Sequence, residues 1–352
     1  MASADRPPYR RILLTRMRFI GDVVLTTPLI RSIRAAYPDA FIAYMADAQA
    51  VSLLEQNPFV NELIPFDFSR PTIIEQTSVA WKLRRLRFDL AIDLFGNPRS
   101  ALLTWFSGAA VRVGPERKGR GRLYTIRVTD DGRPKSAVAF HNQYLTAAGI
   151  PVTAAAPEIF LSDAERRDAR IYLRWLMEGK EGTGGERPIV AFLPGATWPA
   201  KRWLPERFGE LADMAVARLG ARAIVVAGPH DAPEADTLLR SAVAPVHRLP
   251  LLPLRQLAGV LSQCAAVVTN DAGPMHIAAA LGVPTIGIFG PGEENIWFPY
   301  DPALGHRALR KDVPCHPCHL DFCNREGDGY MECMKNLSVG EVFAALDSIL
   351  KR

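Results

Sequence analysis

Short apolar runs alternate with amphipathic segments along most of this chain, and this alternation limits the folds it can adopt. Between residues 10 and 160, the strand-like runs are RILLTRM, AFIAYMA and DLAIDLF. They are separated by PLIRSIRAAYP and EQTSVAWKLRRLRF, whose apolar residues recur at helical spacing. Apolar runs of this length are typical of buried strands, and the segments between them are typical of the helices that cover a sheet. The rhythm therefore predicts a parallel sheet with helices on its faces.

The same rhythm starts again in the second half, where PIVAFLP, ARAIVVAGP, AAVVTN and PTIGIFG are the predicted strands. Between the halves, MEGKEGTGGERP at 177–188 is polar, rich in glycine and without periodicity, which is typical of a linker. We therefore expect two doubly wound, Rossmann-like α/β domains, 1–176 and 187–352, with a cleft between them. In such sheets ligands bind beyond the carboxyl ends of the strands. A capping box, Ser338 with Glu341, predicts a helix at the end of the chain.

Composition narrows the class of protein further. With 352 residues, 48% hydrophobic and 22% charged, the chain is globular and long enough for two cores. Its net charge of +5 suits an anionic partner without identifying one. No apolar run approaches the roughly 18–20 residues that span a membrane. The N-terminus lacks the uninterrupted apolar core of a signal peptide, so we expect a cytoplasmic protein.

The turn after the first predicted strand, FIGDVVLTTPLI, places an acid at the end of that strand. Gly21 permits a tight turn, and Pro28 favours a helix with Thr27 as its N-cap and Pro28 in its first position. Asp22 is then expected in a loop or a short turn ahead of that helix, facing the cleft. An acid here either binds the backbone amides of a helix start or acts in chemistry, and the turn alone leaves both open. The chain has no GxGxxG dinucleotide fingerprint at this turn.

The first turn of the second half, LPGATWPAKRWLPERF, combines small residues with cations. Backbone amides, the Thr197 hydroxyl and Lys201 at one strand end would suit a diphosphate. The Gly-Lys-Ser/Thr ending of a Walker A loop is missing. The alternative is a surface pair, Lys201 and Arg202, beside a core tryptophan, Trp203.

The stretch VVTNDAGPMHIAAALGVPTIGIFGP, residues 267–291, joins an acid, a glycine and a histidine in one turn. Asp271 follows a buried strand, Gly273 allows a ligand close to the backbone, and Pro274 is expected to open a helix. His276 lies in the first turn of that helix and would reach the same ligand, or else serve only in the core. An acid that can bind sugar hydroxyls lies beside a helix start that can bind phosphates. This combination suits a nucleotide sugar.

At this point the chain resembles glycosyltransferase family 9, the ADP-heptose:lipopolysaccharide heptosyltransferases. Four blocks carry the resemblance in the family's order over nearly the full length: RILLTRMRFIGDVVLTTPLIRSIRAAYP, DLAIDLFGNPRSALLTWFSGAAVRVG, LPGATWPAKRWLPERFGELA and VVTNDAGPMHIAAALGVPTIGIFGP. The resemblance implies a GT-B fold whose N-terminal domain binds the lipopolysaccharide core acceptor and whose C-terminal domain binds the ADP-sugar. It also implies an inverting transfer without a metal cofactor.

The resemblance further implies roles for individual residues. Asp22 matches the family's catalytic base and Lys201 its diphosphate-binding lysine, while Asp271, Gly273 and His276 match its donor-binding motif. Many members have threonine where this chain has Ala272, and Thr197 is a compensating hydroxyl donor. Inner-core sugars are anionic, so cations of the first domain are candidates for acceptor binding or else solvated surface. They are Arg16, Arg18, Arg99, Arg117, Lys118, Arg120 and Arg122.

Four of the five cysteines crowd into CHPCHLDFCNREGDGYMEC, which argues against a disulfide framework spread along the chain. Thiols in a reducing compartment can close around a tetrahedral zinc. The candidate ligands of such a structural site are Cys315, Cys318, Cys323 and Cys333. The alternative is a loop of free thiols, because the spacing lacks two paired C-x2-C knuckles. In either case we expect no part for this segment in transfer.

Two rival functions stay open at this level. One is a GT-B transferase or 2-epimerase that uses another nucleotide sugar, which product analysis with ADP-heptose and UDP-sugars distinguishes. The other is a binding protein that kept the fold and lost catalysis, which a substituted Asp22 would mark; Asp22 is present. The expected setting is the cytoplasm, peripheral to the inner membrane, with no nucleic-acid partner. The sequence leaves open the acceptor position and the oligomeric state.

Overall fold

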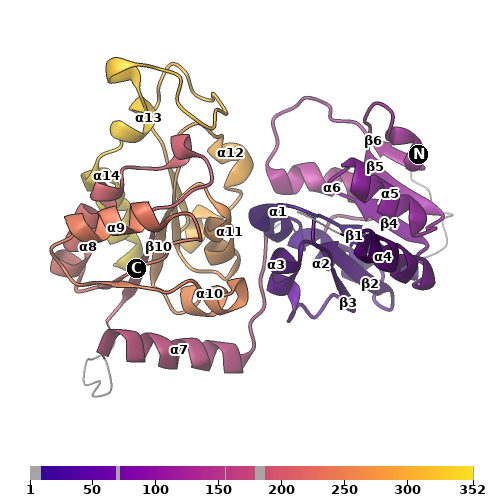
Figure 1. Cartoon of the computed structure of the whole chain (residues 1–352), viewed down its shortest axis with the longest axis horizontal. Helices are drawn as coiled ribbons and strands as arrows, with labels where there is room; N and C mark the ends of the chain where they lie inside the picture. The colour runs from indigo at the N-terminus through magenta and orange to yellow at the C-terminus, as the bar shows by residue number, and fades with distance from the viewer. Residues whose placement is uncertain (1–8, 69–71, 155, 179–186, 352) are drawn as a thin grey trace. The chain divides into compact units, whose positions relative to one another are not determined.

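The structure, a computed structural model, forms two compact units, Met1–Phe160 and Leu161–Arg352 (Figure 1). The residues it describes are 9–68, 72–154, 156–178 and 187–351. Each unit contains a six-stranded sheet in which all neighbouring strands run parallel. The two α/β halves predicted from the alternation of apolar and amphipathic segments are confirmed.

The sheet of the first unit has the strand order β3-β2-β1-β4-β5-β6. Its strands are β1 (Arg11–Thr15), β2 (Phe41–Ala46), β3 (Glu62–Pro65), β4 (Leu90–Asp93), β5 (Val111–Pro115) and β6 (Ile126–Val128). Its helices are α1 (Ile20–Leu25), α2 (Thr27–Ala36), α3 (Ala48–Val51), α4 (Ile73–Arg85), α5 (Pro98–Phe106) and α6 (Ala137–Ala147). The core on one face of the sheet lies under α2 and α6, and the core on the other face lies under α4 and α5. Because both faces are covered, β1 is apolar on both sides, as Leu13 and Leu14 show.

The sheet of the second unit has the order β12-β11-β10-β7-β8-β9. Its strands are β7 (Ile189–Leu193), β8 (Arg222–Val225), β9 (Val246–Arg248), β10 (Ala266–Asn270), β11 (Thr285–Ile288) and β12 (Arg307–Leu309). Its helices are α7 (Asp163–Glu178), α8 (Pro205–Leu219), α9 (Ala232–Ser241), α10 (Leu254–Leu261), α11 (Gly273–Ala280), α12 (Glu294–Trp297), α13 (Glu332–Lys335) and α14 (Val339–Leu350).

The boundary between the units lies earlier than the expected end of the first domain at residue 176. Helix α7 packs on α10 of the second unit. Glu165 of α7 accepts hydrogen bonds from Arg255 of α10, and this contact lowers the pKa of Glu165 to about 2. The surface helix α7 therefore belongs to the second unit. Its local sequence did not indicate this assignment. The expected linker, 177–188, falls largely on residues 179–186, which are outside the described residues.

Each sheet has one position where the chain reverses its direction of travel across the sheet. In the first unit this is between β1 and β4, which are neighbours with Thr15 opposite Asp93. In the second unit it is between β7 and β10, with Leu193 opposite Thr269. The connections after two such strands leave in opposite directions, so a crevice opens at their carboxyl ends. The fold therefore predicts one ligand-binding edge in each unit.

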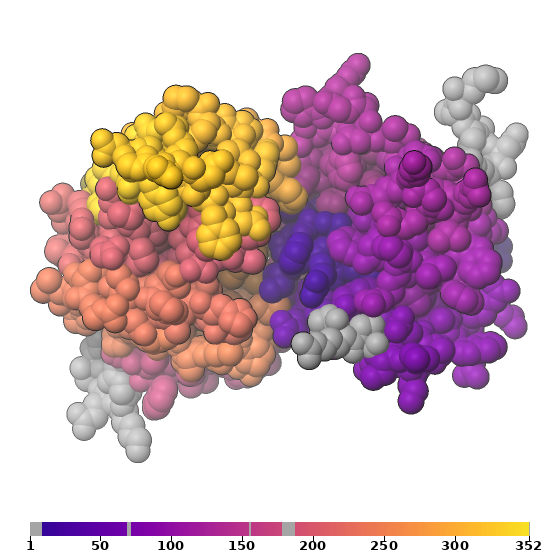
Figure 2. All heavy atoms as spheres, turned by 45° about the horizontal axis from the view of Figure 1, so that its top comes forward, coloured from indigo at the N-terminus to yellow at the C-terminus, as the bar shows by residue number. Residues whose placement is uncertain are grey.

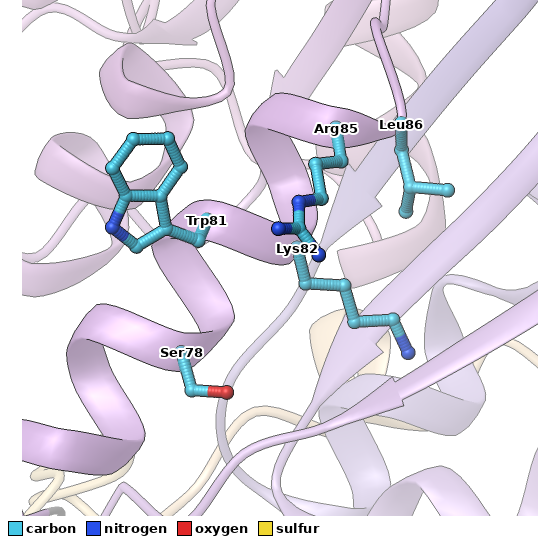
Figure 3. A pocket seen from close by; sticks show the side chains of 5 residues that line it. All are labelled: Ser78, Trp81, Lys82, Arg85 and Leu86. Carbon is cyan, nitrogen blue, oxygen red and sulfur yellow. The ribbon is translucent and has the colours of Figure 1, made fainter.

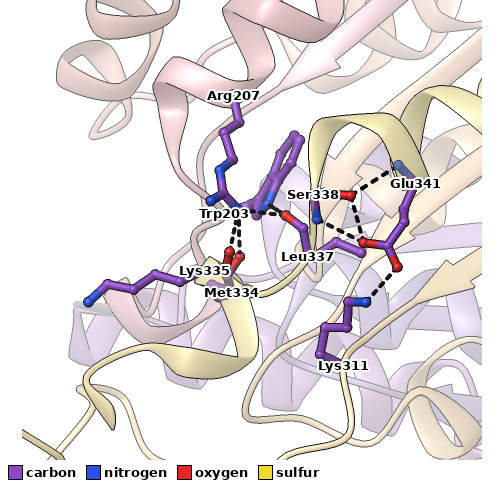
Figure 4. A network of polar contacts seen from close by, with 8 residues as sticks. All are labelled: Trp203, Arg207, Lys311, Met334, Lys335, Leu337, Ser338 and Glu341. Carbon is purple, nitrogen blue, oxygen red and sulfur yellow. Dashed lines mark hydrogen bonds and ion pairs between the residues drawn. The ribbon is translucent and has the colours of Figure 1, made fainter. Parts of the chain in front are cut away.

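The end of the chain is fastened to the start of α8 (Figure 4). The fully buried Trp203 donates its indole hydrogen bond to Leu337 O at 3.0 Å, and Arg207 donates to the same oxygen at 2.6 Å. Ser338 and Glu341 form the predicted capping box of α14, which is confirmed. The C-terminal residues, yellow in Figure 2, lie on the surface of the second unit.

Candidate functional site

The candidate base, Asp22, lies at the β1/β4 edge of the first unit. Its Oδ1 accepts a hydrogen bond from Arg16 Nη2, and its Oδ2 accepts one from the backbone amide of Phe19 at 3.0 Å. Arg16 follows β1 directly and also donates to Leu94 O, which follows β4, at 3.0 Å. Arg16 therefore joins the ends of both central strands to the Asp22 carboxylate. Each carboxylate oxygen keeps a further lone pair with which it can accept a substrate proton.

The local helices around Asp22 differ in one respect from the expectation. Asp22 is the third residue of the short helix α1, within the range of positions predicted for it. Helix α2 has Thr26 as its N-cap and begins at Thr27, so Pro28 is its second residue and not its first. Proline is compatible with either position, because neither N–H has an acceptor within the helix.

A histidine that sequence reasoning missed, His141 of α6, is buried in the same unit near Arg16 and Asp22. Burial, together with the charge of Arg16, lowers the pKa of His141 to about 3, against the weaker opposite effect of Asp22. Its Nδ1 has no hydrogen-bond partner. His141 is thus neutral at physiological pH and adds no second positive charge beside the Arg16–Asp22 pair.

This histidine gives the stability of the protein a pH dependence. The unfolded chain binds a proton on His141 below about pH 6.5, whereas the folded chain does so only near pH 3. The unfolded state therefore holds more protons in this window, and stability falls as the pH is lowered through it. Between pH 7 and pH 5 we expect His141 to account for a loss of about 2 kcal/mol in the free energy of unfolding. Urea unfolding of wild type and His141→Gln at both pH values measures it, and identical pH dependence of the two proteins would contradict the assignment.

A second residue missed from the sequence, Asp93, organises the turn after β4. It is fully buried, and its Oδ1 accepts hydrogen bonds from Thr15 Oγ1 at 3.1 Å and from the amide of Gly96 at 3.0 Å. Its Oδ2 accepts one from Tyr124 OH at 2.6 Å. Gly96 has a φ of +67°, and a Cβ there would lie 2.1 Å from Pro115 Cγ, so only glycine fits. This network holds in place the turn that carries Leu94 O. The signal in the sequence was an acid at the end of a buried strand, like the one that marked Asp271 after β10.

The cations expected to bind the acceptor differ in their exposure and in their contacts with the rest of the protein. Arg16 and Arg99 already contact the protein, since Arg99 donates to Phe68 O at 3.0 Å. Arg18 is exposed beside Phe19, whose ring is 67% exposed. Arg120 is partly buried, and its Nε lacks a partner. The remaining candidates are exposed: Arg117, Lys118 and Arg122.

At the β7/β10 edge of the second unit, Lys201 and Asp271 lie together. Lys201 Nζ is 2.5 Å from Asp271 Oδ2 and 4.5 Å from the centre of the Trp198 ring. The pair is close enough for an ion pair, although no hydrogen bond of good geometry reaches Asp271 Oδ2. Their side chains are 16% and 6% exposed, so Lys201 is not the solvated surface cation of the alternative considered above. Arg202 turns away from it and pairs with Glu234.

A glycine that sequence reasoning missed lies against this pair. A Cβ on Gly292 would be 3.0 Å from Asp271 Oδ2 and 3.9 Å from Lys201 Nζ. The backbone after β11 thus comes close to both charged groups. Asn270, fully buried, links the two turns of this edge, because it accepts from Trp203 N at 3.0 Å and donates to Pro194 O at 2.7 Å.

The other donor-binding candidates lie on the same two turns. Gly273 begins α11, and His276 in its first turn is buried, with Nδ1 2.8 Å from Tyr300 OH. This contact fixes the imidazole ring and is also what a structural histidine would make. Thr197 is exposed in the loop that leads from β7 to Lys201. The structure therefore brings Lys201 and Asp271 into contact and places the remaining three on their turns.

The cysteine-rich segment lies beside this edge, which the sequence did not indicate. His316 Nε2 is 3.2 Å from Gly292 O, and the His319 amide donates to Pro291 O at 3.0 Å. Asp321 O accepts from the amide of Ala200, the residue before Lys201, at 3.0 Å. The segment thus supports the backbone on both sides of the Lys201–Asp271 pair, in addition to leading to the last helix.

The four thiols of this segment are free and partly exposed. Burial and the neighbouring thiols raise the pKa of Cys333 to about 11. Within the part of the chain that the structure describes, no group of three or more His, Cys, Asp or Glu side chains is arranged to hold a metal ion. The predicted zinc site therefore has no support from the geometry and stays a prediction.

Metal analysis of protein purified without chelator or nickel resin tests the zinc prediction. Four thiolate ligands would hold about one zinc per chain. A metal-free, active protein with four titratable thiols in 315–333 would show instead that the segment is held by its backbone contacts alone. Cys264 is the internal control, since it is buried and should react only on unfolding.

Comparison with known proteins shows which family this chain resembles in sequence and in structure. A model of the family described as Glycosyltransferase family 9 (heptosyltransferase) matches residues 76–326. The Lipopolysaccharide heptosyltransferase 2 of Salmonella typhimurium is 30% identical, over 97% of this chain and 98% of its own. The structure of Escherichia coli ADP-heptose lps heptosyltransferase II is similar with a TM-score of 0.78 at 26% identity, covering 97% of this chain and 98% of that one. A family 9 glycosyl transferase from Veillonella parvula shares the fold, with a TM-score of 0.82 at 24% identity and 97% coverage of both chains.

Proposed function

This chain belongs to glycosyltransferase family 9, the heptosyltransferase family, and on that premise we propose that it moves a heptose from ADP-heptose to the inner core of lipopolysaccharide. The fold class predicted from the sequence, α/β GT-B with two Rossmann-like units, is confirmed. We further propose that the first unit binds the acceptor and the second binds the nucleotide sugar.

One observation carries this proposal: each strand-reversal edge holds one half of the chemistry. The β1/β4 edge holds a carboxylate, Asp22, kept in place by Arg16. The β7/β10 edge holds a lysine, Lys201, beside an acid, Asp271, that precedes a helix start. A transfer with inversion needs a base for the acceptor hydroxyl and positive charge for the leaving diphosphate, and these residues provide both.

In the proposed mechanism, Asp22 takes the proton of the acceptor hydroxyl as that oxygen attacks the anomeric carbon. The bond to the ADP oxygen breaks, and Lys201 neutralises the charge that develops on the diphosphate. Asp271 accepts hydrogen bonds from sugar hydroxyls once Lys201 has moved towards the phosphates. The backbone amides at the start of α11, near Gly273, donate hydrogen bonds to the remaining phosphate oxygens. These groups supply the stabilisation without a metal ion, and the lone hydroxyl of Thr197 takes the place of the one absent at Ala272.

The acceptor side of the proposal rests on cations at the first edge. Arg18 and Arg120 have guanidinium nitrogens without a protein acceptor among the hydrogen bonds and ion pairs of the described residues, and they suit core carboxylates or phosphates. Arg16 and Arg99 would contribute from their present contacts. None of the described helices is long and apolar enough to cross a membrane. We propose that the protein meets its lipid-borne acceptor at the cytoplasmic face of the inner membrane.

Product analysis tests the function directly. The purified protein is incubated with a heptose-deficient lipopolysaccharide core and either ADP-heptose or a UDP-sugar, and the products are separated and weighed by mass spectrometry. We expect a core heavier by one heptose and free ADP with ADP-heptose only. Transfer from the UDP-sugar alone would support the rival transferase, and an altered nucleotide sugar with no transfer would support an epimerase. Binding of ADP-heptose without either product would mark an inactive relative.

A further inference from the structure

The outer faces of α4 and α5 in the first unit gather large apolar side chains that no part of the described structure covers. Their exposed fractions run from 47% to 79%. We call this surface the α4–α5 face, and its members are Ile73, Ile74, Trp81, Leu102, Trp105 and Phe106.

The two helices present this face in the same direction. They pack against each other (Figure 1). Their inner residues, Leu83 and Leu103, belong to the same core on one side of the sheet. On α5 the exposed residues Leu102, Trp105 and Phe106 follow the spacing of one helix face. The buried Ser100 and Thr104 lie on the opposite face. These exposed apolar residues of α5 therefore do not contribute to the core. Large exposed apolar side chains gathered on two neighbouring helices are typical of an interaction surface.

Positive charge borders this apolar surface at the C-terminal end of α4. Four exposed cations lie in the last turn of α4 and just after it. They are Lys82, Arg84, Arg85 and Arg87. Lys82 pairs with Glu62 of β3 at 2.7 Å. Glu75, the acid among the residues of α4 and α5, is used in the capping box of α4 and pairs with none of these cations in the described structure. A hollow of about 560 Å³ on α4 is lined by both kinds of side chain, with the Trp81 ring on one side and Lys82 and Arg85 on the other (Figure 3).

The α4–α5 face begins at the edge that carries Asp22. Helix α4 follows β3, and α5 follows β4, so the N-termini of both helices lie on the side of the carboxyl ends of the strands. Ile73 and Ile74 are therefore near that edge, and the cations lie towards the far end of α4. The exposed Phe19 and Arg18 belong to the same edge. A body lying on this face would border the proposed acceptor site.

We propose that the α4–α5 face docks on the surface of an anionic phospholipid bilayer, so that the sugars of a membrane-anchored acceptor reach the Asp22 edge. This inference rests on the proposed function, which supplies the lipid-borne acceptor. Tryptophan and aliphatic side chains enter the headgroup boundary, while lysine and arginine meet the negative lipid surface. A second copy of this chain fits poorly as the occupant, because equivalent patches would bring like charges together.

Vesicle co-sedimentation with the full chain tests the docking surface. The vesicles contain phosphatidylcholine alone or with phosphatidylglycerol, at low and at high salt. The apolar variant combines Trp81→Ser, Trp105→Ser and Phe106→Ser, and the charge variant combines Lys82→Gln with Arg85→Gln. The matched control is Ile171→Ser with Trp175→Ser, which removes equally exposed residues from α7 of the second unit.

We expect the wild type to bind vesicles that contain phosphatidylglycerol and to be released by salt. The apolar variant should lose at least tenfold in partition, and the charge variant about fivefold per cation removed. The α7 control should bind as the wild type does. The proposal is overturned if the wild type ignores anionic vesicles, or if both face variants bind as well as the wild type. A change of the apolar variant from dimer to monomer in sedimentation, without loss of vesicle binding, would assign the face to a second copy.

A transfer assay separates this inference from the proposed function. With a delipidated core oligosaccharide in solution, both face variants should transfer heptose at the wild-type rate. With the acceptor embedded in vesicles, their kcat/KM should fall by at least tenfold. Absence of transfer to either acceptor by the wild type would refute the function while the vesicle binding still decided the surface. Equal loss on both acceptors would show a damaged fold and refute the docking role for those variants' residues.

Discussion

Replacement of Asp22 by asparagine is expected to lower kcat for heptose transfer by about 100- to 10,000-fold, the usual cost of removing a general base. Asparagine keeps the shape, but it cannot take a proton. Its single carbonyl oxygen replaces only one of the two carboxylate oxygens that accept from Arg16 and from the Phe19 amide. The affinity for ADP should stay within a few-fold of wild type, because the proposed donor-binding residues all belong to the other unit. Steady-state kinetics and ADP titration measure the two quantities.

Asp47 offers a matched control for this variant. It also follows a strand of the same sheet, β2, and its Oδ1 accepts from the Gln49 amide as the cap of α3. Asparagine caps a helix about as well as aspartate, so Asp47→Asn should keep wild-type stability and turnover. Near-normal turnover by Asp22→Asn would eliminate Asp22 as the base. Equal losses in both variants would point to a damaged sheet edge and not to lost chemistry.

Replacement of Lys201 by alanine is expected to weaken ADP by at least tenfold and to leave adenosine binding within about twofold. A charge-assisted hydrogen bond is worth about 1.5–3 kcal/mol. The variant also leaves Asp271, only 6% exposed, without its cation and close to the diphosphate, which adds repulsion. Calorimetric titration of both ligands gives the comparison.

The double variant Lys201→Ala/Asp271→Ala distinguishes lost attraction from added repulsion. If repulsion contributes, the double variant should bind ADP more tightly than Lys201→Ala alone, while remaining weaker than wild type. Lys201→Arg, which keeps the charge, should retain most of the affinity. Wild-type ADP affinity in Lys201→Ala would refute the assignment of this lysine to the diphosphate.

The sequence by itself determined the central strands of both sheets and the polar turns that follow them, but it did not indicate the outer strands β3, β5, β6, β9 and β12. The central strands and their turns depend on local physics, because the apolar period sets strand or helix and residues such as Ser338 and Pro205 set where a helix begins. An acid in the polar turn after a buried strand identified both Asp22 and Asp271. Asp271 follows β10 directly, whereas Asp22 lies within α1, beyond the end of β1. The turns left an ordinary alternative for Asp22, a helix-start acid, and for Lys201, a surface cation, because neither alternative can be decided without the neighbouring residues.

Only the tertiary structure decided those neighbours. Strand order placed β4 beside β1, which brought Leu94 O and Asp22 to one guanidinium, that of Arg16. In the same way it brought Asp271, 70 positions along the chain from Lys201, into contact with it and placed Gly292 against both. It also assigned α7 to the second unit and placed the cysteine-rich segment beside the β7/β10 edge. Contacts between residues far apart in sequence depend on which strands pair and which faces are buried, and local periodicity does not encode that choice.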